Sequence, residues 1–233
     1  VAGSIGSQPL PIDTIPVDRD GLPPEMISDD TDVIFTSPSH QSPTTATMPM
    51  DRRRVLLDRA RDIDAVIVED DYEFEMSFLA APSPALKSLD RDGRVVYVGS
   101  FSKSLFPGLR LGYMVGSEPF IRQARALRAN VLRHPPGHIQ RTVAYFLSLG
   151  HYDAQIRRTA KKLHQRRTMM ESGISEHGLT IAGRGVYGGS SIWMEADPSV
   201  DMAEVARSLM PQSVLVEPGA PFFAEQNGQY NYY

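Results

Sequence analysis

Short apolar runs that turn polar at their ends recur along the first half of the chain. They lie at residues 32–39 (DVIFTSPS), 65–71 (AVIVEDD), 94–100 (RVVYVGS) and 109–117 (LRLGYMVGS). Near-continuous apolar runs of this length, rather than strict alternation, are typical of strands buried on both faces. We therefore predict strands of one sheet that helices cover.

Helical spacing fills the intervals between these runs and continues after the last of them. Residues 50–64 have helical character, so that 32–39, this helix and 65–71 form a predicted strand–helix–strand unit with parallel strands. Apolar positions three and four residues apart predict further helices. These are a short helix at residues 21–30 and longer ones at about 120–131, 139–147, 153–177 and 201–209.

The last part of the chain returns to strand-like segments. Residues 9–17, near the start, are interrupted by prolines and predict an extended edge segment. We divide the chain into a large α/β domain, residues 1–150, and a smaller α+β domain, residues 151–233. The predicted strands of the smaller domain are residues 179–183 (LTIAG), 190–196 (SSIWMEA) and 214–218 (VLVEP).

Composition narrows the class of protein without naming a function. The chain has 233 residues, 41% of them hydrophobic and 22% charged, which are ordinary values for a globular protein with a sizeable core. A net charge of −4 gives no positive footprint for nucleic acid, and the absence of cysteine excludes disulfides and thiolate chemistry. No apolar run approaches the roughly 18 residues of a membrane span, and the first residues lack a signal-peptide pattern. We expect a soluble, cytoplasmic protein with no membrane partner.

Polar clusters follow three of the predicted strands. The carboxyl ends of parallel strands meet at one edge of a sheet, where α/β proteins bind ligands. One cluster holds Lys103, whose amine could attack a carbonyl if burial and nearby cations lower its pKa. The hydroxyls of Ser100 and Ser102 and the forked guanidinium of Arg110 suit a phosphate monoester.

A second cluster places carboxylates and a phenol at the end of residues 65–71. A carboxylate there could pair with a protonated ring nitrogen and make the ring a better electron sink. A phenol two residues later points to the same face of an extended chain and could bind a ring oxygen. Phosphate, aldehyde, pyridine nitrogen and phenolic oxygen together describe pyridoxal phosphate (PLP).

The same residues resemble a known family. Residues 68–75 (VEDDYEFE) and 98–113 (VGSFSKSLFPGLRLGY) resemble the cofactor site of fold type I aminotransferases. Residues 36–44 (TSPSHQSPT) resemble the Thr-Pro-Ser-His-Gln-x-Pro-Thr signature of MocR-type regulators. In that family an aminotransferase-like domain follows a winged helix-turn-helix domain of the GntR kind. The implied fold is a mostly parallel, helix-covered sheet of the fold type I PLP-dependent transferase class, with a smaller α+β domain.

The resemblance assigns roles to residues of both clusters and of the loop after residue 36. Lys103 would form the internal aldimine, Asp70 would pair with the pyridine nitrogen, and Tyr72 would contact the ring oxygen. Ser42 stands where many aminotransferases have asparagine, and Thr45 replaces a glycine. The phosphate would be held by Ser100, Ser102 and Arg110, and the ring-oxygen side of the site would include His40 and Gln41.

The resemblance also implies parts that this sequence does not contain. Family members have a glycine-rich phosphate-binding turn and a stacking aromatic upstream, and a substrate-binding arginine downstream. We therefore expect a chain truncated at both ends, in which PLP is bound weakly or not at all. The implied partners are a small amine or amino-acid effector, a second copy in a homodimer, and DNA only through a domain absent from this chain.

Several alternatives stay open on sequence alone. The chain could be a regulatory domain in which an amine effector forms the external aldimine, a free-standing aminotransferase, or a dimerisation domain that has lost its cofactor. The acidic pair Asp70 and Asp71 could be a Mg²⁺ ligand pair instead. Arg52 to Arg54 and the basic stretch 157–167 are predicted to be solvated helix surfaces, and Trp193 a core residue.

Overall fold

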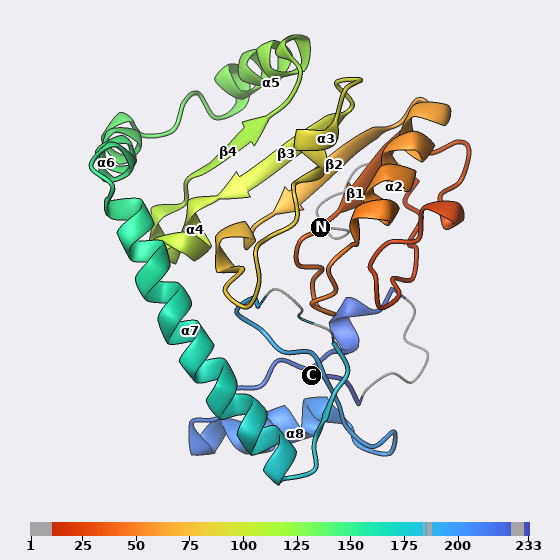
Figure 1. The fold of residues 1–233 in the computed structure, drawn as a ribbon, viewed down its shortest axis with the longest axis vertical. Helices are drawn as coiled ribbons and strands as arrows, with labels where there is room; N and C mark the ends of the chain where they lie inside the picture. The colour runs from red at the N-terminus through yellow and green to blue at the C-terminus, as the bar shows by residue number, and fades with distance from the viewer. Residues whose placement is uncertain (1–10, 184, 186–187, 225–230) are drawn as a thin grey trace.

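The four apolar runs of the first half form one sheet. A computed structural model describes residues 11–183, 185, 188–224 and 231–233. The strands lie in the order β1-β2-β3-β4, with β1, β2 and β3 parallel and β4 antiparallel to β3. The carboxyl ends of the three parallel strands therefore meet at one edge, the edge facing α4 and the C-terminal part in Figure 1. The strands are β1 (Val33–Thr36), β2 (Val66–Asp71), β3 (Val95–Ser100) and β4 (Gly112–Val115).

Two helices cover one face of this sheet (Figure 1): α2 (Met50–Asp62) and α3 (Leu86–Leu89). The strand register places Ile34, Ile67 and Val95 side by side on that face, and all three are buried. They form the core together with residues of α2 and α3, so the predicted strand–helix–strand unit is confirmed. On the opposite face Phe35 and Met114 are 50% and 47% exposed, so the described residues cover that face less completely.

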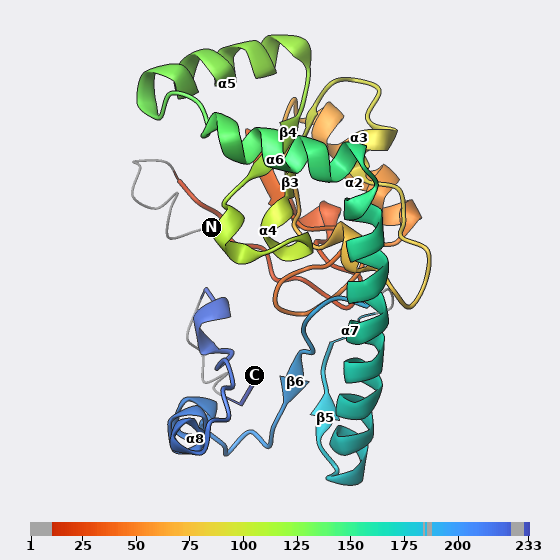
Figure 2. The ribbon, with the colours of Figure 1, turned by 90° about the vertical axis from the view of Figure 1, so that its left-hand side faces the viewer.

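The predicted helices after the sheet are also present. Figures 1 and 2 show α7 running from the end of α6 along the C-terminal part, so that one long helix connects the two parts of the molecule. The further short elements are α4 (Phe101–Ser104) and the 3₁₀ helices Pro24–Met26, Phe74–Met76 and Pro107–Leu109. The longer helices are α5 (Glu118–Val131), α6 (Gly137–Ser148), α7 (His151–Glu176) and α8 (Met202–Leu209).

The C-terminal part packs around one tryptophan. The antiparallel pair β5 (Thr180–Ile181) and β6 (Met194–Glu195) follows α7, and 3₁₀ helices cover Met210–Gln212 and Ala220–Phe222. Trp193 is buried and stacks on Tyr232 at a centroid distance of 5.4 Å, which confirms the predicted core role. The division into two domains at residue 150 stays a prediction.

Two predicted extended segments differ from the structure. Residues 214–218 form no strand, because no described segment pairs with them, and Leu215 remains 81% exposed. Residues 11–17 are likewise irregular, while residues 9 and 10 of that segment lie outside the described residues. Among the helices that the structure describes, none combines the length and the apolar character needed to cross a membrane.

Candidate functional site

The two aspartates at the end of β2 lie on opposite faces of the sheet. Asp70 pairs with Val98 on the less covered face and Asp71 pairs with Gly99 on the covered face. Adjacent residues that point apart do not form one ligand pair, which argues against the magnesium alternative. Burial raises the pKa of Asp70 above its usual value, so a cation placed against this carboxyl would stabilise its ionised form.

The Asp71 carboxyl belongs to the buried interior. It is 3% exposed and accepts a hydrogen bond from the Ser39 hydroxyl at 3.2 Å. Burial, and next the negative charge of Glu69, raise the pKa of Asp71 to about 7. Asp71 therefore links β2 to the loop before His40.

This buried carboxyl should make the stability of the chain depend on pH. Because its pKa is 3.8 when unfolded and about 7 when folded, the folded chain holds a proton that the unfolded chain releases between these values. The unfolding free energy should therefore fall as pH rises through this window, by up to about 1.4 kcal/mol per pH unit, and level off above it. Urea unfolding at about pH 5 and about pH 7.5 measures the fall.

The Asp71→Asn variant tests the assignment because its amide does not titrate. Relative to the wild type, its unfolding free energy should rise from the lower to the higher pH. Asp62→Asn, at the exposed end of α2, is the matched control and should follow the wild type. An equal difference between Asp71→Asn and the wild type at both pH values would contradict the prediction.

Lys103 lies just beyond the end of β3, on the short helix α4. Its side chain is 53% exposed, so its amine is accessible to a small molecule. The Nζ atom lies 5.8 Å from the centre of the Tyr72 ring and 3.5 Å from Oε1 of Glu73. The structure thus brings together the lysine and the phenol that the sequence placed in separate clusters.

The predicted phosphate-binding residues surround the same helix. The Ser100 hydroxyl caps α4 by accepting a hydrogen bond from the Ser102 backbone N–H at 3.2 Å. Arg110 follows the 3₁₀ helix Pro107–Leu109 in a left-handed conformation (φ 49°), is exposed, and makes no ion pair or side-chain hydrogen bond with the described residues. The Ser100 hydroxyl therefore already caps α4, and if it also binds the phosphate it does both.

Tyr72 contacts the residue that replaces the usual asparagine. Burial raises the pKa of Tyr72 to about 12, and the neighbouring Ser42 side chain opposes this rise. The phenol is consequently protonated near neutral pH and can donate a hydrogen bond to a ring oxygen.

His40 and Gln41 have different environments although they are adjacent. His40 is 4% exposed, and neither ring nitrogen has a hydrogen-bond partner among the described residues. Burial lowers the pKa of His40, which keeps the ring neutral. Gln41 instead braces its own loop, since its Oε1 accepts hydrogen bonds from the Thr44 N–H at 3.1 Å and hydroxyl at 2.6 Å. Thr45 has a φ of 59°, which explains why glycine is usual at that position.

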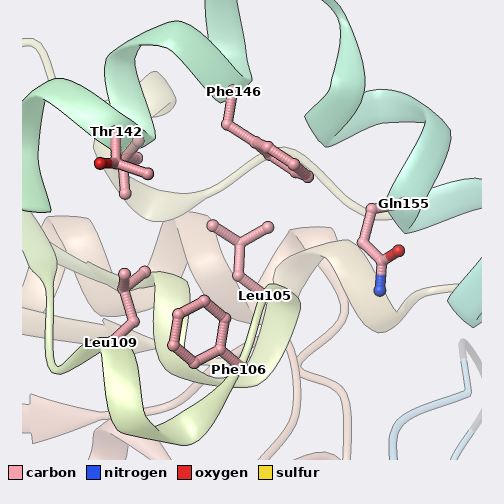
Figure 3. A pocket seen from close by; sticks show the side chains of 7 residues that line it. Leu105, Phe106, Leu109, Thr142, Phe146 and Gln155 are labelled. Carbon is pink, nitrogen blue, oxygen red and sulfur yellow. The ribbon is translucent and has the colours of Figure 1, made fainter.

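An apolar pocket lies next to α4, the short helix that carries Lys103 (Figure 3). Leu105, Phe106 and Leu109 face the side chains of α6 across it, and Phe146 points toward Leu105. Its lining contains no charged residue and does not include Lys103, so it does not suit a phosphate ester. The chemistry of the site lies at the strand ends instead.

Comparison with known proteins then decides the family. A model of the family described as aminotransferase class I and II matches residues 24–232. The chain belongs to this family. The fold predicted from the sequence is confirmed by its similarity to a crystal structure of Pyrococcus horikoshii kynurenine aminotransferase in complex with PMP. The two chains have a TM-score of 0.83 and are 28% identical in sequence, and the match covers 94% of this chain and 56% of the aminotransferase. LysN of Thermus thermophilus, an alpha-aminoadipate aminotransferase complexed with N-(5'-phosphopyridoxyl)-L-leucine, has a TM-score of 0.83 at 26% identity, with 94% of this chain and 58% of LysN covered.

Several of the curated relatives are transcriptional regulators. The HTH-type transcriptional regulator TauR of Rhodobacter capsulatus is 52% identical over 233 residues, which are 100% of this chain and 48% of TauR. The probable rhizopine catabolism regulatory protein MocR of Rhizobium meliloti is 36% identical over 167 residues, 70% of this chain and 33% of MocR. The chain thus spans about half the length, or less, of these relatives. The predicted resemblance to MocR-type regulators is confirmed.

Two polar residues of this aminotransferase-like site were not predicted from the sequence. Glu73 is 3% exposed and pairs with Lys103, and its carboxylate also accepts hydrogen bonds from the hydroxyl and the N–H of Ser190. Glu73 stands among several acidic residues in 68–75, and nothing in their spacing marks the one that faces the lysine. Ser190 lies 117 residues further along the chain, so only the tertiary structure brings it here.

Arg53 corrects the prediction that residues 52–54 form a solvated surface. It is fully buried, because it lies on the same face of α2 as Leu56 and Ala60, three and seven residues later. Its guanidinium donates hydrogen bonds of 2.9 Å to three backbone carbonyls, those of Met48, Pro84 and Pro38. It therefore fixes the loop that leads to His40.

The residues present fit PLP. An accessible lysine amine, a protonated phenol and a half-buried carboxyl stand at one edge of the sheet, and both nitrogens of His40 are buried without a hydrogen-bond partner among the described residues. Such unpaired buried nitrogens are costly unless a ligand or water satisfies them. The individual roles of the residues in the site stay predictions.

Proposed function

We propose that this chain is the PLP- and effector-binding part of a MocR-type transcriptional regulator, with Lys103 as the residue that bonds PLP. The observation that carries the proposal is the position of the Lys103 amine over the Tyr72 ring at the carboxyl ends of parallel strands. The 52% identity to a transcriptional regulator over the whole chain favours a regulatory use of this site.

The chain's own residues would divide the work of holding PLP. When bound, PLP supplies an aldehyde that condenses with a primary amine and a ring that withdraws electrons. Asp70 would hold the proton on the ring nitrogen, and Tyr72 would donate to the ring oxygen. Arg110 would reach the phosphate from its exposed turn, and the hydroxyls of Ser100 and Ser102 would assist.

The chemistry of the site defines the class of effector and partners. Exchange of the Lys103 amine for another amine is the reaction that such a site favours, so the effector is a small amine or amino acid. In this proposal the effector changes how the chain acts on a DNA-binding segment of the full-length protein, in a cytoplasmic homodimer. The regulators among the curated relatives support the link to DNA.

Trapping with borohydride tests the proposal directly. The purified chain is incubated with PLP, reduced, digested and mapped by mass spectrometry. We expect one stoichiometric adduct, on the peptide that contains Lys103. Adducts scattered over surface lysines, or none, would contradict the proposal for this chain.

A free-standing aminotransferase is the second candidate. It is favoured by the likeness to kynurenine aminotransferase and LysN, at TM-scores of 0.83. In that case Lys103 would also move a proton between the substrate and the cofactor. Turnover of an amino acid to the keto acid by the PLP-loaded chain would favour this candidate, whereas binding without turnover would favour the regulator.

Asp70→Asn should weaken PLP binding by about tenfold or more, because a hydrogen bond between charged groups is replaced by one to a neutral amide. Titration of the chain with PLP, followed by its absorption spectrum, measures the affinity. Asp71→Asn is the matched control, since Asp71 faces the opposite side of the sheet. Equal affinities of the two variants would exclude Asp70 as the partner of the ring nitrogen.

A further inference from the structure

Glu73 joins the site lysine to a turn of the C-terminal part. Its buried carboxylate lies 3.5 Å from the Lys103 Nζ through Oε1. The same Oε1 accepts a short hydrogen bond from the Ser190 hydroxyl, and Oε2 accepts one from the Ser190 N–H at 3.2 Å. One side chain thus contacts both Lys103 and Ser190.

The turn that carries Ser190 is shaped for this contact. Gly188 and Gly189 have φ values of 119° and 93°, which side chains rarely allow, and a Cβ on Gly189 would lie 3.3 Å from Oε2 of Glu73. Other anchors hold the turn independently of the lysine. The Arg167 Nη1 donates to the Gly188 carbonyl at 3.1 Å, and the Gly189 N–H donates to the Met76 carbonyl at 3.1 Å.

We propose that Glu73 is a positioning residue that couples the charge on Lys103 to the turn at residues 188–190. A buried carboxylate is stable only while cations and hydrogen-bond donors compensate its charge. If the ammonium is removed, Glu73 turns toward water and releases Ser190. By reciprocity, displacement of the turn also changes how firmly the amine is held.

The cofactor step of this inference rests on the proposed function. Condensation of the amine with an aldehyde forms a C=N bond, releases water and passes the ammonium proton to solvent, so it separates Glu73 from its cation. Occupation of Lys103 would then reach the C-terminal part through Ser190. A regulator needs such a link between its ligand and the rest of the molecule.

Amide hydrogen exchange at Ser190 measures the coupling without any cofactor. In Lys103→Met the ammonium is lost, and we expect the Ser190 amide to exchange about fivefold faster or more. Lys103→Arg keeps a positive charge, so its Ser190 amide should exchange at the wild-type rate. Lys87→Met is the matched control, since Lys87 pairs with Asp90 and does not contact the turn.

Two further measurements separate coupling from general loosening. The Ala196 amide, which donates to the Asn231 carbonyl at 2.8 Å, should keep its hydrogen-exchange rate in every variant. If Lys103→Met does not fold, Lys103→Gln is a second variant that removes the charge. In a Glu73→Gln background, Lys103→Met should no longer accelerate Ser190, because no buried charge remains to be released. Acceleration in that background, or none in the wild-type background, would overturn the inference.

The last experiment measures the same hydrogen exchange after PLP is added, without borohydride. Faster exchange of Ser190 on addition of PLP supports the coupling. If PLP attaches at Lys103 and the rate is unchanged, the inference is wrong although the proposed function stands. If PLP does not attach but Lys103→Met accelerates Ser190, the proposed function fails and the coupling stands.

Discussion

The Lys103→Arg variant should lose all borohydride-stable attachment of PLP, while it keeps its fold and the charge beside Glu73. A guanidinium has no nucleophilic primary amine and stays protonated, so it cannot condense with an aldehyde. The side chain is 53% exposed, which leaves room for arginine. Intact-mass measurement after incubation with PLP and reduction gives the fraction of chain modified, which should fall from one adduct per chain to none.

Lys87→Arg is the control for this prediction. Lys87 also has an acidic partner, with its Nζ 2.8 Å from Oδ2 of Asp90, but it lies on α3 and does not pair with Glu73. This variant should keep the adduct at Lys103 in full. An adduct that survives Lys103→Arg would assign the covalent chemistry to another amine and remove the basis of the proposed function.

Arg53→Met should lower the unfolding free energy by about 3 kcal/mol or more, since it removes three hydrogen bonds from a charged guanidinium, two of them buried, at roughly 1 kcal/mol or more each. The carbonyls of Met48 and Pro38 lie in the loop between β1 and α2, and the carbonyl of Pro84 lies in the loop before α3. Methionine fills a similar volume, so a cavity adds little to the expected loss. Urea unfolding followed by circular dichroism measures the difference.

The neighbouring arginine supplies a matched control. Arg54 is exposed on the same helix, and Arg54→Met should change the unfolding free energy by less than about 0.5 kcal/mol. Similar losses for the two variants would mean that the effect comes from the charge or helix propensity of α2. Because Arg53 fixes the loop before His40, its replacement should also loosen that loop.

Much of the sheet could be predicted from local pattern. The runs at 65–71 and 94–100 correspond closely to β2 and β3, because short apolar segments that end in polar residues have few other stable conformations. Side-chain alternation along a strand predicts that Asp70 and Asp71 point apart, and the register places them on opposite faces. The polar clusters meet because they follow the carboxyl ends of parallel strands, which lie at one edge of the sheet.

Local pattern was insufficient where burial depends on distant partners. Residues 214–218 have the composition of a strand but find no neighbouring strand, and without cross-strand hydrogen bonds the extended conformation is not a strand. Arginine is usually a surface residue, yet Arg53 is buried because three carbonyls from two loops accept its hydrogen bonds.

Local pattern in the sequence was enough, then, to predict the four strands of the main sheet, the side of each strand on which a residue lies, and the family to which the lysine cluster belongs. These depend on backbone preferences and on side-chain alternation within a few residues. Only the tertiary structure decided that Glu73 stands beside Lys103 and that Ser190 completes its hydrogen bonds. The physical reason is that a buried charge takes its partners from whatever the packed chain brings within reach, here across 117 residues, and no local pattern encodes that choice.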